Sequence, residues 1–160
     1  MRGRYEPSAL VIADLGRSPL EYHRSGDVRR LAVVDPASGP ALAGDHYFAA
    51  VPRNIYTGKN GRRLKRPRVE MTPGAADGTV AFLDYHQYGP HGIYIDYMKT
   101  RRDYQRRGLA RRLVEDLIAR HPGVKWVHFG KLMNPTMGKI FDETVARHGA
   151  AINFAGHRDY

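Results

Sequence analysis

A basic turn that leads into a predicted helix is the stretch of the sequence best suited to bind a charged ligand. Residues 101–112 read RRDYQRRGLARR, and Gly108 stands where the helix is expected to begin. The first N–H groups of a helix have no partner inside it and carry the positive end of its dipole, so a phosphate binds there readily. Arginines on the turn add fixed positive charge. Because glycine has no Cβ, Gly108 would let a pyrophosphate approach the main chain closely.

Two predicted strands before this turn are rich in tyrosine, histidine and aspartate. We expect them at residues 79–86 and 91–99, joined through the turn at 87–90. Alternate side chains of a strand share a face, so the second strand should present two rows. One row holds Tyr94, Asp96 and Met98, and the other holds Ile93, Ile95 and Tyr97. Each residue alone is ordinary for a sheet, but the group directly precedes the basic turn.

The basic turn and its surroundings resemble the GNAT superfamily of acyl-coenzyme A-dependent N-acyltransferases. The family's central motif is Gln or Arg, two variable residues, Gly, one variable residue, and then Gly or Ala, which Gln105, Gly108 and Ala110 fill here. A strand precedes the motif, and a helix, a strand and a helix opened by Asn134 follow it. This order is similar to the family's coenzyme-binding half and covers roughly residues 91–155. The resemblance implies an α+β fold with a mixed, mostly antiparallel, twisted central sheet flanked by helices.

The resemblance also implies acetyl-coenzyme A as the cofactor, used without a metal ion or a covalent enzyme intermediate. In the family, a splayed strand offers backbone N–H groups to the pantetheine arm and the thioester carbonyl, a role that falls by position to Met98 and Thr100. The Asn that opens the later helix usually contacts the coenzyme arm, although Asn134 could equally serve only to cap its helix. The expected cofactor-binding residues are Met98, Thr100, Gln105, Arg106, Arg107, Gly108, Leu109, Ala110 and Asn134.

Acyl transfer to an amine also needs a group that removes the amine proton and stabilisation of the developing oxyanion. Asp96 is the first candidate base, with His91 and His128 behind it, and a water relay is an alternative. A metal site is not expected, because His86 and His91 have no third ligand nearby in the sequence.

The proton donor is the point at which this sequence departs from the family. Many members place a tyrosine seven residues after the helix-opening Asn, where this chain has Phe141, which has no proton to give. Another tyrosine (Tyr94, Tyr97 or Tyr85) would then be the acid, or the thiolate would leave unaided. The expected catalytic residues are therefore Asp96, Tyr94, Tyr97 and His91.

A formal net charge of +10 points to a second class of partner. Much of the charge lies between residues 59 and 68, inside a Gly- and Pro-rich segment at 52–77 that we expect to be a basic loop or hairpin. Such a cluster is either a solvated surface or a contact for a polyanion, for which nucleic acid, DNA or tRNA, is the natural candidate. The expected nucleic-acid-binding residues are Lys59, Arg62, Arg63, Lys65, Arg66 and Arg68.

The sequence before the basic segment indicates short elements. We expect a strand at 9–14, a brief helix begun by Ser18 and Pro19, and strands at 30–35 and 46–51.

Longer elements are expected after the basic turn. An apolar stripe marks the helix that follows the turn, formed by Leu109, Leu113, Val114, Leu117 and Ile118. A strand at 124–130 and the helix from Asn134 come next, and a last strand is expected at 150–155. The buried stripe of that later helix is predicted to be Met137, Ile140, Phe141 and Val145.

Length and composition bound the remaining possibilities. A chain of 160 residues suggests one GNAT-like domain, residues 1–160. The absence of cysteine excludes a disulfide framework and a cysteine nucleophile. The N-terminal apolar run is too short for a signal peptide and no stretch approaches a membrane span, so a cytoplasmic protein without a membrane partner is expected, and a homodimer stays open.

Two functions from different classes follow. The first is an acetyl-coenzyme A-dependent N-acetyltransferase acting on an amine acceptor, either a small amine, a protein or an amine carried on nucleic acid. The second is a GNAT-fold protein directed at nucleic acid, either a DNA-modifying enzyme similar to the phage Mom type or a non-catalytic binding domain.

Overall fold

The computed structural model describes residues 7–38 and 78–160. The strands in this part are β1 (Glu21–Ser25), β2 (Val28–Val34), β3 (Thr79–Tyr88), β4 (Gly92–Thr100), β5 (Trp126–Leu132) and β6 (Asn153–Arg158). The α-helices are α1 (Ala9–Leu15), α2 (Leu109–Arg120) and α3 (Pro135–His148).

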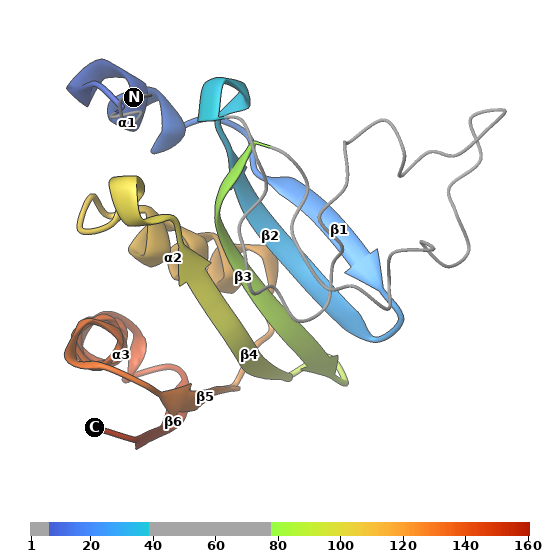
Figure 1. The fold of residues 1–160 in the computed structure, drawn as a ribbon. Coiled ribbons are helices and arrows are strands. Elements are labelled where there is room, and N and C mark those ends of the chain that lie inside the picture. Colours follow the sequence, from blue (N-terminus) through green and yellow to red (C-terminus); the bar gives the residue numbers. More distant parts are fainter. Residues whose placement is uncertain (1–6, 39–77) are drawn as a thin grey trace, which may run out of the picture.

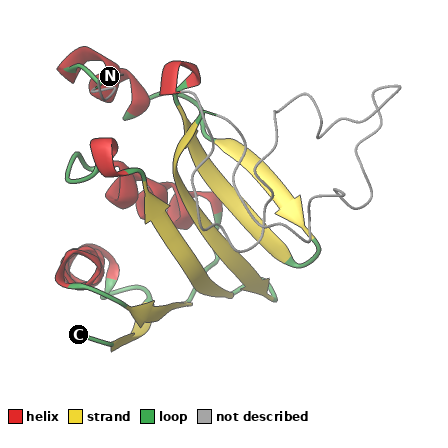
Figure 2. Cartoon of the chain, viewed as in Figure 1, coloured by secondary structure: helices red, strands yellow, loops and turns green. Residues whose placement is uncertain are grey.

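These strands form one mixed sheet in the order β1-β2-β3-β4-β5-β6 (Figure 1). The first four strands pair antiparallel, and β5 and β6 continue the sheet in parallel with β4. The chain crosses from β4 to β5 through α2 and from β5 to β6 through α3, which Figure 2 shows in red beside the yellow sheet. The predicted α+β architecture is therefore confirmed.

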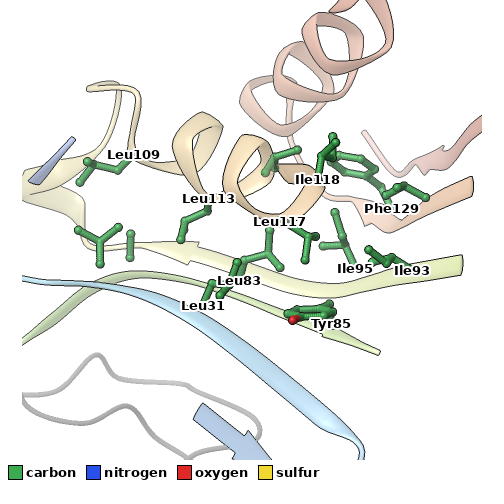
Figure 3. Packing of buried hydrophobic residues seen from close by; sticks show 14 of the residues in the cluster. Leu31, Leu83, Tyr85, Ile93, Ile95, Leu109, Leu113, Leu117, Ile118 and Phe129 are labelled. Atoms are coloured by element: carbon green, nitrogen blue, oxygen red, sulfur yellow. The ribbon is translucent and has the colours of Figure 1, made fainter. Parts of the chain in front are cut away.

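The main core lies between the sheet and the two long helices (Figure 3). The predicted stripe of α2 is buried along its whole length, from Leu109 to Ile118. It packs on apolar side chains of β2, β3 and β4, among them Leu31, Leu83 and Ile95. Each fully buried leucine of this kind contributes about 1.5–3 kcal/mol through removal of apolar surface from water. We call this side of the sheet the helix face and the other side the opposite face.

Helix α3 begins where the sequence predicted, but its buried residues differ from the predicted stripe. Met137, Ile140 and Phe141 are only partly buried against the main core. The Asn134 Oδ1 accepts a hydrogen bond of 2.9 Å from the Met137 N–H, which makes Asn134 the N-cap. Val145 was expected to be buried and is 36% exposed, whereas Thr144 is buried instead. The Thr144 hydroxyl donates to the Ile140 carbonyl at 2.7 Å, so its polar group is satisfied inside the helix and the side chain can be buried.

Two expectations for the N-terminal region are wrong. Residues 9–14 are helical rather than extended, because the Ser8 hydroxyl caps the Val11 N–H at 3.2 Å and Leu15 reaches the core. The N–H of Ser18 donates to the Asp14 carbonyl at 2.8 Å, so Ser18 lies just after a helix rather than at the start of one. The expected second helix is instead strand β1.

The later elements follow the sequence prediction with shifted boundaries. Strand β5 begins and ends two residues later than expected, and β6 begins at Asn153 rather than at residue 150. The expected strand at 46–51 and the basic segment at 52–77 lie outside the described residues. None of the helices in the described ranges is long and apolar enough to cross a membrane.

Candidate active site

The basic turn places a row of unused N–H groups at the start of α2. After β4 ends, a 3-10 turn over Arg102–Tyr104 leads to Gln105, and both Arg106 (φ 61°) and Gly108 (φ 82°) have left-handed backbone conformations. Within the described residues, no group accepts a hydrogen bond from the backbone N–H groups of residues 106–110. A Cβ built on Gly108 would meet nothing within 4 Å. Glycine is therefore favoured here by its backbone conformation, and the space in front of it is open to a ligand.

Buried and polar contacts hold this turn in place. The Tyr104 hydroxyl, which is fully buried, donates to the Asp35 carboxylate at 2.6 Å. The Gln105 side-chain amide donates to the Thr100 carbonyl at 2.9 Å, so the first motif residue braces the turn. Arg112 reaches back to the carbonyls of Leu15 and Ser18. Arg106 and Arg107 remain exposed at the mouth of the turn.

Strands β4 and β5 separate before they reach this turn. Their ladder runs from the pair Gly92–Trp126 to the pair Ile95–Phe129 and then ends, although both strands continue. Beyond that point β4 pairs with β3 and β5 pairs with β6 (Figure 1). The facing edges at residues 96–100 and 130–132 therefore carry backbone groups that this ladder does not use.

The Tyr94 hydroxyl lies at the point of separation. A Cβ built on Gly130 would lie 3.2 Å from the Tyr94 hydroxyl, 3.2 Å from the Ile95 carbonyl oxygen and 3.7 Å from the Asp96 carbonyl oxygen. Any side chain at Gly130 would crowd this position. The glycine thus leaves room for a phenol where the two strands part.

Asp96 is an extra residue in β4. Asp84 pairs with Tyr97 and Tyr85 pairs with Ile95, so the register of the β3–β4 ladder skips Asp96. Such a β-bulge shifts the alternation of side chains and re-aims those near it. The prediction that Tyr97 shares a row with Ile93 and Ile95 is therefore wrong.

The side chains after the bulge confirm this shift. Tyr97 packs on Phe82 of the opposite face, with ring centroids 5.8 Å apart, whereas Met98 packs against the main core. The bulge thus places the side chains of Asp96 and Tyr97 together on the opposite face.

A cluster of polar side chains forms around Asp96. The His86 Nε2 lies 3.5 Å from the Asp96 Oδ2, and the two side chains are 26% and 24% exposed. His86 is paired with Tyr94 across β3 and β4, and Tyr94 is paired in turn with His128 of β5. The Tyr94 and His128 rings meet edge to face, with centroids 4.9 Å apart. The structure therefore brings together Asp96 and Tyr94, which were predicted as site residues, and adds His86.

His86 was not among the predicted catalytic residues, although the hairpin could have indicated it. Tyr88 pairs with Gly92 across the turn. Moving two residues away from the turn on each strand therefore places His86 opposite Tyr94. The feature of the sequence that could have indicated His86 was thus the length of the turn between the two strands, rather than a motif.

Other candidate residues lie elsewhere. The His91 Nδ1 bonds the Gly123 carbonyl at 2.8 Å at the start of β4, far from the phosphate turn at its end. Tyr85 lies on the helix face, where its hydroxyl is 3.4 Å from the His121 Nε2. Burial, followed by the nearby Tyr22 phenol, raises the pKa of Tyr85. The Phe141 ring packs edge to face on Phe129, with centroids 5.2 Å apart.

The described residues contain no group of three or more His, Cys, Asp or Glu side chains that could hold a metal ion. The six predicted nucleic-acid-binding residues lie outside the described ranges.

The sequence matches the family model described as acetyltransferase (GNAT) family over residues 61–130. Over this range, 70 of the 160 residues, the chain is similar to the GNAT acetyltransferases. GNAT proteins generally use an acyl-coenzyme A, typically acetyl-coenzyme A, and the family supports acyl transfer as the general activity.

The match begins earlier than the resemblance noted in the sequence and ends sooner. It includes β3, β4, the basic turn and α2, and stops at Gly130, so Asn134 and Phe141 lie beyond the matched GNAT residues. No curated protein and no solved structure matches the chain.

Proposed function

We propose that this protein is an acetyl-coenzyme A-dependent N-acetyltransferase that acylates an amine. The observation that carries the proposal is the separation of β4 from β5 beside a turn with unused N–H groups. An extended ligand with a phosphate at one end and an acyl group at the other fits this arrangement. Acetyl-coenzyme A has this chemistry, and when bound it supplies the acetyl group as a thioester.

The residues of the turn and of β4 fit such a ligand. The N–H groups of residues 106–110 would receive the pyrophosphate, with Arg106 and Arg107 adding positive charge. The backbone of Met98 and Thr100, on the edge of β4 that faces away from β3, would hold the pantetheine arm. Asn134 would contribute from the start of α3 in addition to capping it.

The cluster around Asp96 supports the proton transfers. In the proposed reaction the Asp96 carboxylate, with His86 beside it, accepts the proton that the amine loses when its nitrogen bonds to the acyl carbon. The Tyr94 hydroxyl at the strand separation donates a proton to the departing sulfur. Asp96 is on the opposite face, so the buried Tyr85 on the helix face takes no part. Tyr97 and His91 remain predictions without a role in this scheme.

Replacing Gly108 by glutamate should remove the thermal stabilisation that acetyl-coenzyme A gives to the wild type. The new side chain puts bulk and negative charge in the open space before the helix. A ligand at 100 times its Kd stabilises the folded state by about 2.7 kcal/mol, so thermal unfolding with and without ligand measures the loss.

Gly89→Glu is the matched control for this test. Gly89 also has a positive φ (64°) and open space where a Cβ would lie, but it is in the β3–β4 turn. The Gly89→Glu variant should therefore have the same backbone strain as Gly108→Glu but keep the thermal stabilisation by acetyl-coenzyme A. Absence of any stabilisation of the wild type by millimolar acetyl-coenzyme A would contradict the proposed function.

A second candidate function is action on nucleic acid, including a Mom-type DNA modification or binding alone. The observation that favours it is the concentration of positive charge at residues 59–68. Each phosphate that a duplex-binding protein neutralises adds roughly 0.9 to the slope of log affinity against log salt concentration.

A variant in which four cations of the basic segment are changed to serine should flatten the salt dependence of DNA or RNA binding and leave coenzyme binding intact. The four are Arg62, Arg63, Lys65 and Arg66. Filter binding over a range of salt concentrations measures this salt dependence. The control variant changes four exposed cations elsewhere to serine: Arg17, Arg24, Lys125 and Lys139. Equal slopes for the two variants would mean that net charge alone matters, and weak binding by the wild type would leave the basic segment as a solvated surface.

A further inference from the structure

Two exposed aromatic rings lie side by side on the opposite face of the sheet. Tyr88 at the end of β3 and Trp126 at the start of β5 have centroids 6.0 Å apart and ring planes only 23° apart. Their exposed fractions are 56% and 38%. Both rings keep a large part of their surface in contact with solvent and lie outside the core clusters, so the arrangement calls for a reason other than core packing.

The residue between them is a glycine that Trp126 requires. Gly92 of β4 pairs with Tyr88 on one side and with Trp126 on the other. A Cβ built on Gly92 would lie 2.1 Å from an atom of the Trp126 indole. The indole therefore lies across the strand in the space that a side chain would fill. Even an alanine at Gly92 would lift the ring from the sheet.

This aromatic pair is adjacent to the proposed catalytic cluster. The next row of side chains on the same face holds His86, Tyr94 and His128. Successive side chains on one face of a strand are about 7 Å apart, so one such step separates the rings from this row. The His86 and Tyr88 rings are neighbours, with centroids 6.3 Å apart, and Asp96 lies beyond His86.

We propose that Tyr88 and Trp126 bind a planar aromatic ring of the acceptor, whose amine then reaches His86 and Asp96. The ring stacks on the aromatic pair because flat π-surfaces prefer parallel, offset contact. The carboxylate of Asp96 complements the positive charge of a protonated amine. The spacing of about 7 Å to the His86 row suits a ring and an amine joined by a short chain. The Asp96 carboxylate meets this row at His86, 3.5 Å from its Nε2.

The fate of the amine in this proposal depends on the proposed acetyltransferase function, but binding of the ring does not. Two sources share the ring chemistry: a free arylalkylamine and a nucleobase carrying an amine. The aromatic pair does not distinguish them by itself, because every base also presents a flat π-face.

The sequence provides a direct probe of this site. Trp126 is the single tryptophan in the chain, so tryptophan fluorescence reports on the aromatic pair alone. We expect 2-phenylethylamine to change this fluorescence and to bind roughly 3- to 10-fold more tightly than 2-cyclohexylethylamine, which has similar size but no π-system. The same titration with adenosine and with single-stranded RNA tests the nucleobase source.

Variants separate stacking from general apolar contact. Tyr88→Leu should reduce the preference for the phenyl compound over the cyclohexyl compound while keeping the tryptophan signal. Tyr22→Leu, at a tyrosine that is 46% exposed on β1, should leave the preference unchanged. Circular dichroism checks that both variants are folded.

The outcomes are distinguishable. A response to 2-phenylethylamine or to adenosine supports the aromatic site and names the source of the ring. A response without acetylation of any amine supports the site and overturns the proposed acetyltransferase function. Equal affinity for the phenyl and cyclohexyl compounds, or no fluorescence change with any ring compound, overturns the proposal.

Discussion

Asp96→Asn should lower kcat for amine acetylation by ~10²–10⁴-fold, the range that a general base typically contributes. Asparagine keeps the size of the side chain and removes its ability to accept the amine proton. The bulge in β4 is a backbone feature, so the variant should fold normally and bind acetyl-coenzyme A as the wild type does. Steady-state kinetics with a saturating amine, together with thermal unfolding with and without ligand, measures both properties.

Asp27→Asn provides a control in the β1–β2 turn, where the aspartate is exposed and is separated from β4 by β3. It should leave kcat unchanged. If Asp96→Asn retains wild-type turnover, proton removal belongs instead to a histidine, with His86 and His128 the nearest in the cluster, or to water.

Asp84→Ala should destabilise the fold by about 3–5 kcal/mol, the cost of leaving one member of a buried ion pair without its partner. Asp84 on β3 accepts two hydrogen bonds from the Arg30 guanidinium on β2, at 2.7 and 2.8 Å. The side chains of Arg30 and Asp84 are 2% and 0% exposed. The guanidinium also lies 3.6 Å from the centroid of the Phe82 ring. Urea denaturation measures the change in the free energy of unfolding.

Two comparisons test the cause. Asp14→Ala removes the partner of Arg17 in a pair whose side chains are 66% and 75% exposed, and it should cost less than about 1 kcal/mol. The double variant Arg30→Met, Asp84→Leu should recover most of the loss, because it removes both charges together. If the single Asp84→Ala variant is as stable as the wild type, the prediction is wrong, and water takes the place of the carboxylate beside Arg30.

The elements that could be predicted from the sequence are those with a strong local signal. The apolar stripe of the twelve-residue helix α2 repeats every three or four residues from Leu109 to Ile118, and the structure buries all of it. Asn134 followed by Pro135 marked the start of α3 through capping chemistry that depends on neighbouring residues alone. Gly108 likewise marked the start of α2. It is the N-cap residue of this helix and has a left-handed backbone conformation, which favours glycine.

The N-terminal errors arose because short segments carry weak signals. Residues 9–14 are apolar enough for either a strand or a single pair of helical turns, and the Ser8 cap and the contact of Leu15 with the core decide the outcome. Ser18 and Pro19 match the start of a helix in sequence, but the preceding helix already uses Ser18 at its end.

Only part of the candidate site could be predicted, because some of its residues are placed by strand pairing rather than by local sequence. Asp96 and Tyr94 were identified by residue type and by their position before the turn. The side on which Tyr97 lies depends on the extra residue in β4, and strict alternation contains no signal for such a bulge. His86 becomes a neighbour of Asp96 only through the pairing of β3 with β4, which is a tertiary property.

The strand order described above also bears on how the chain assembles during synthesis. In the described part of the protein, each strand lies next to the one made just before it, from β1 to β6. A growing polypeptide can therefore add every new strand to an edge that already exists, and no strand has to be inserted between two that are already paired. Sheets built from such sequential neighbours have shorter loops to close than sheets with distant partners, which favours fast folding. Because β5 is made after β2, β3 and β4, the separation between β4 and β5 can form only after the strands on the other side of it have been made.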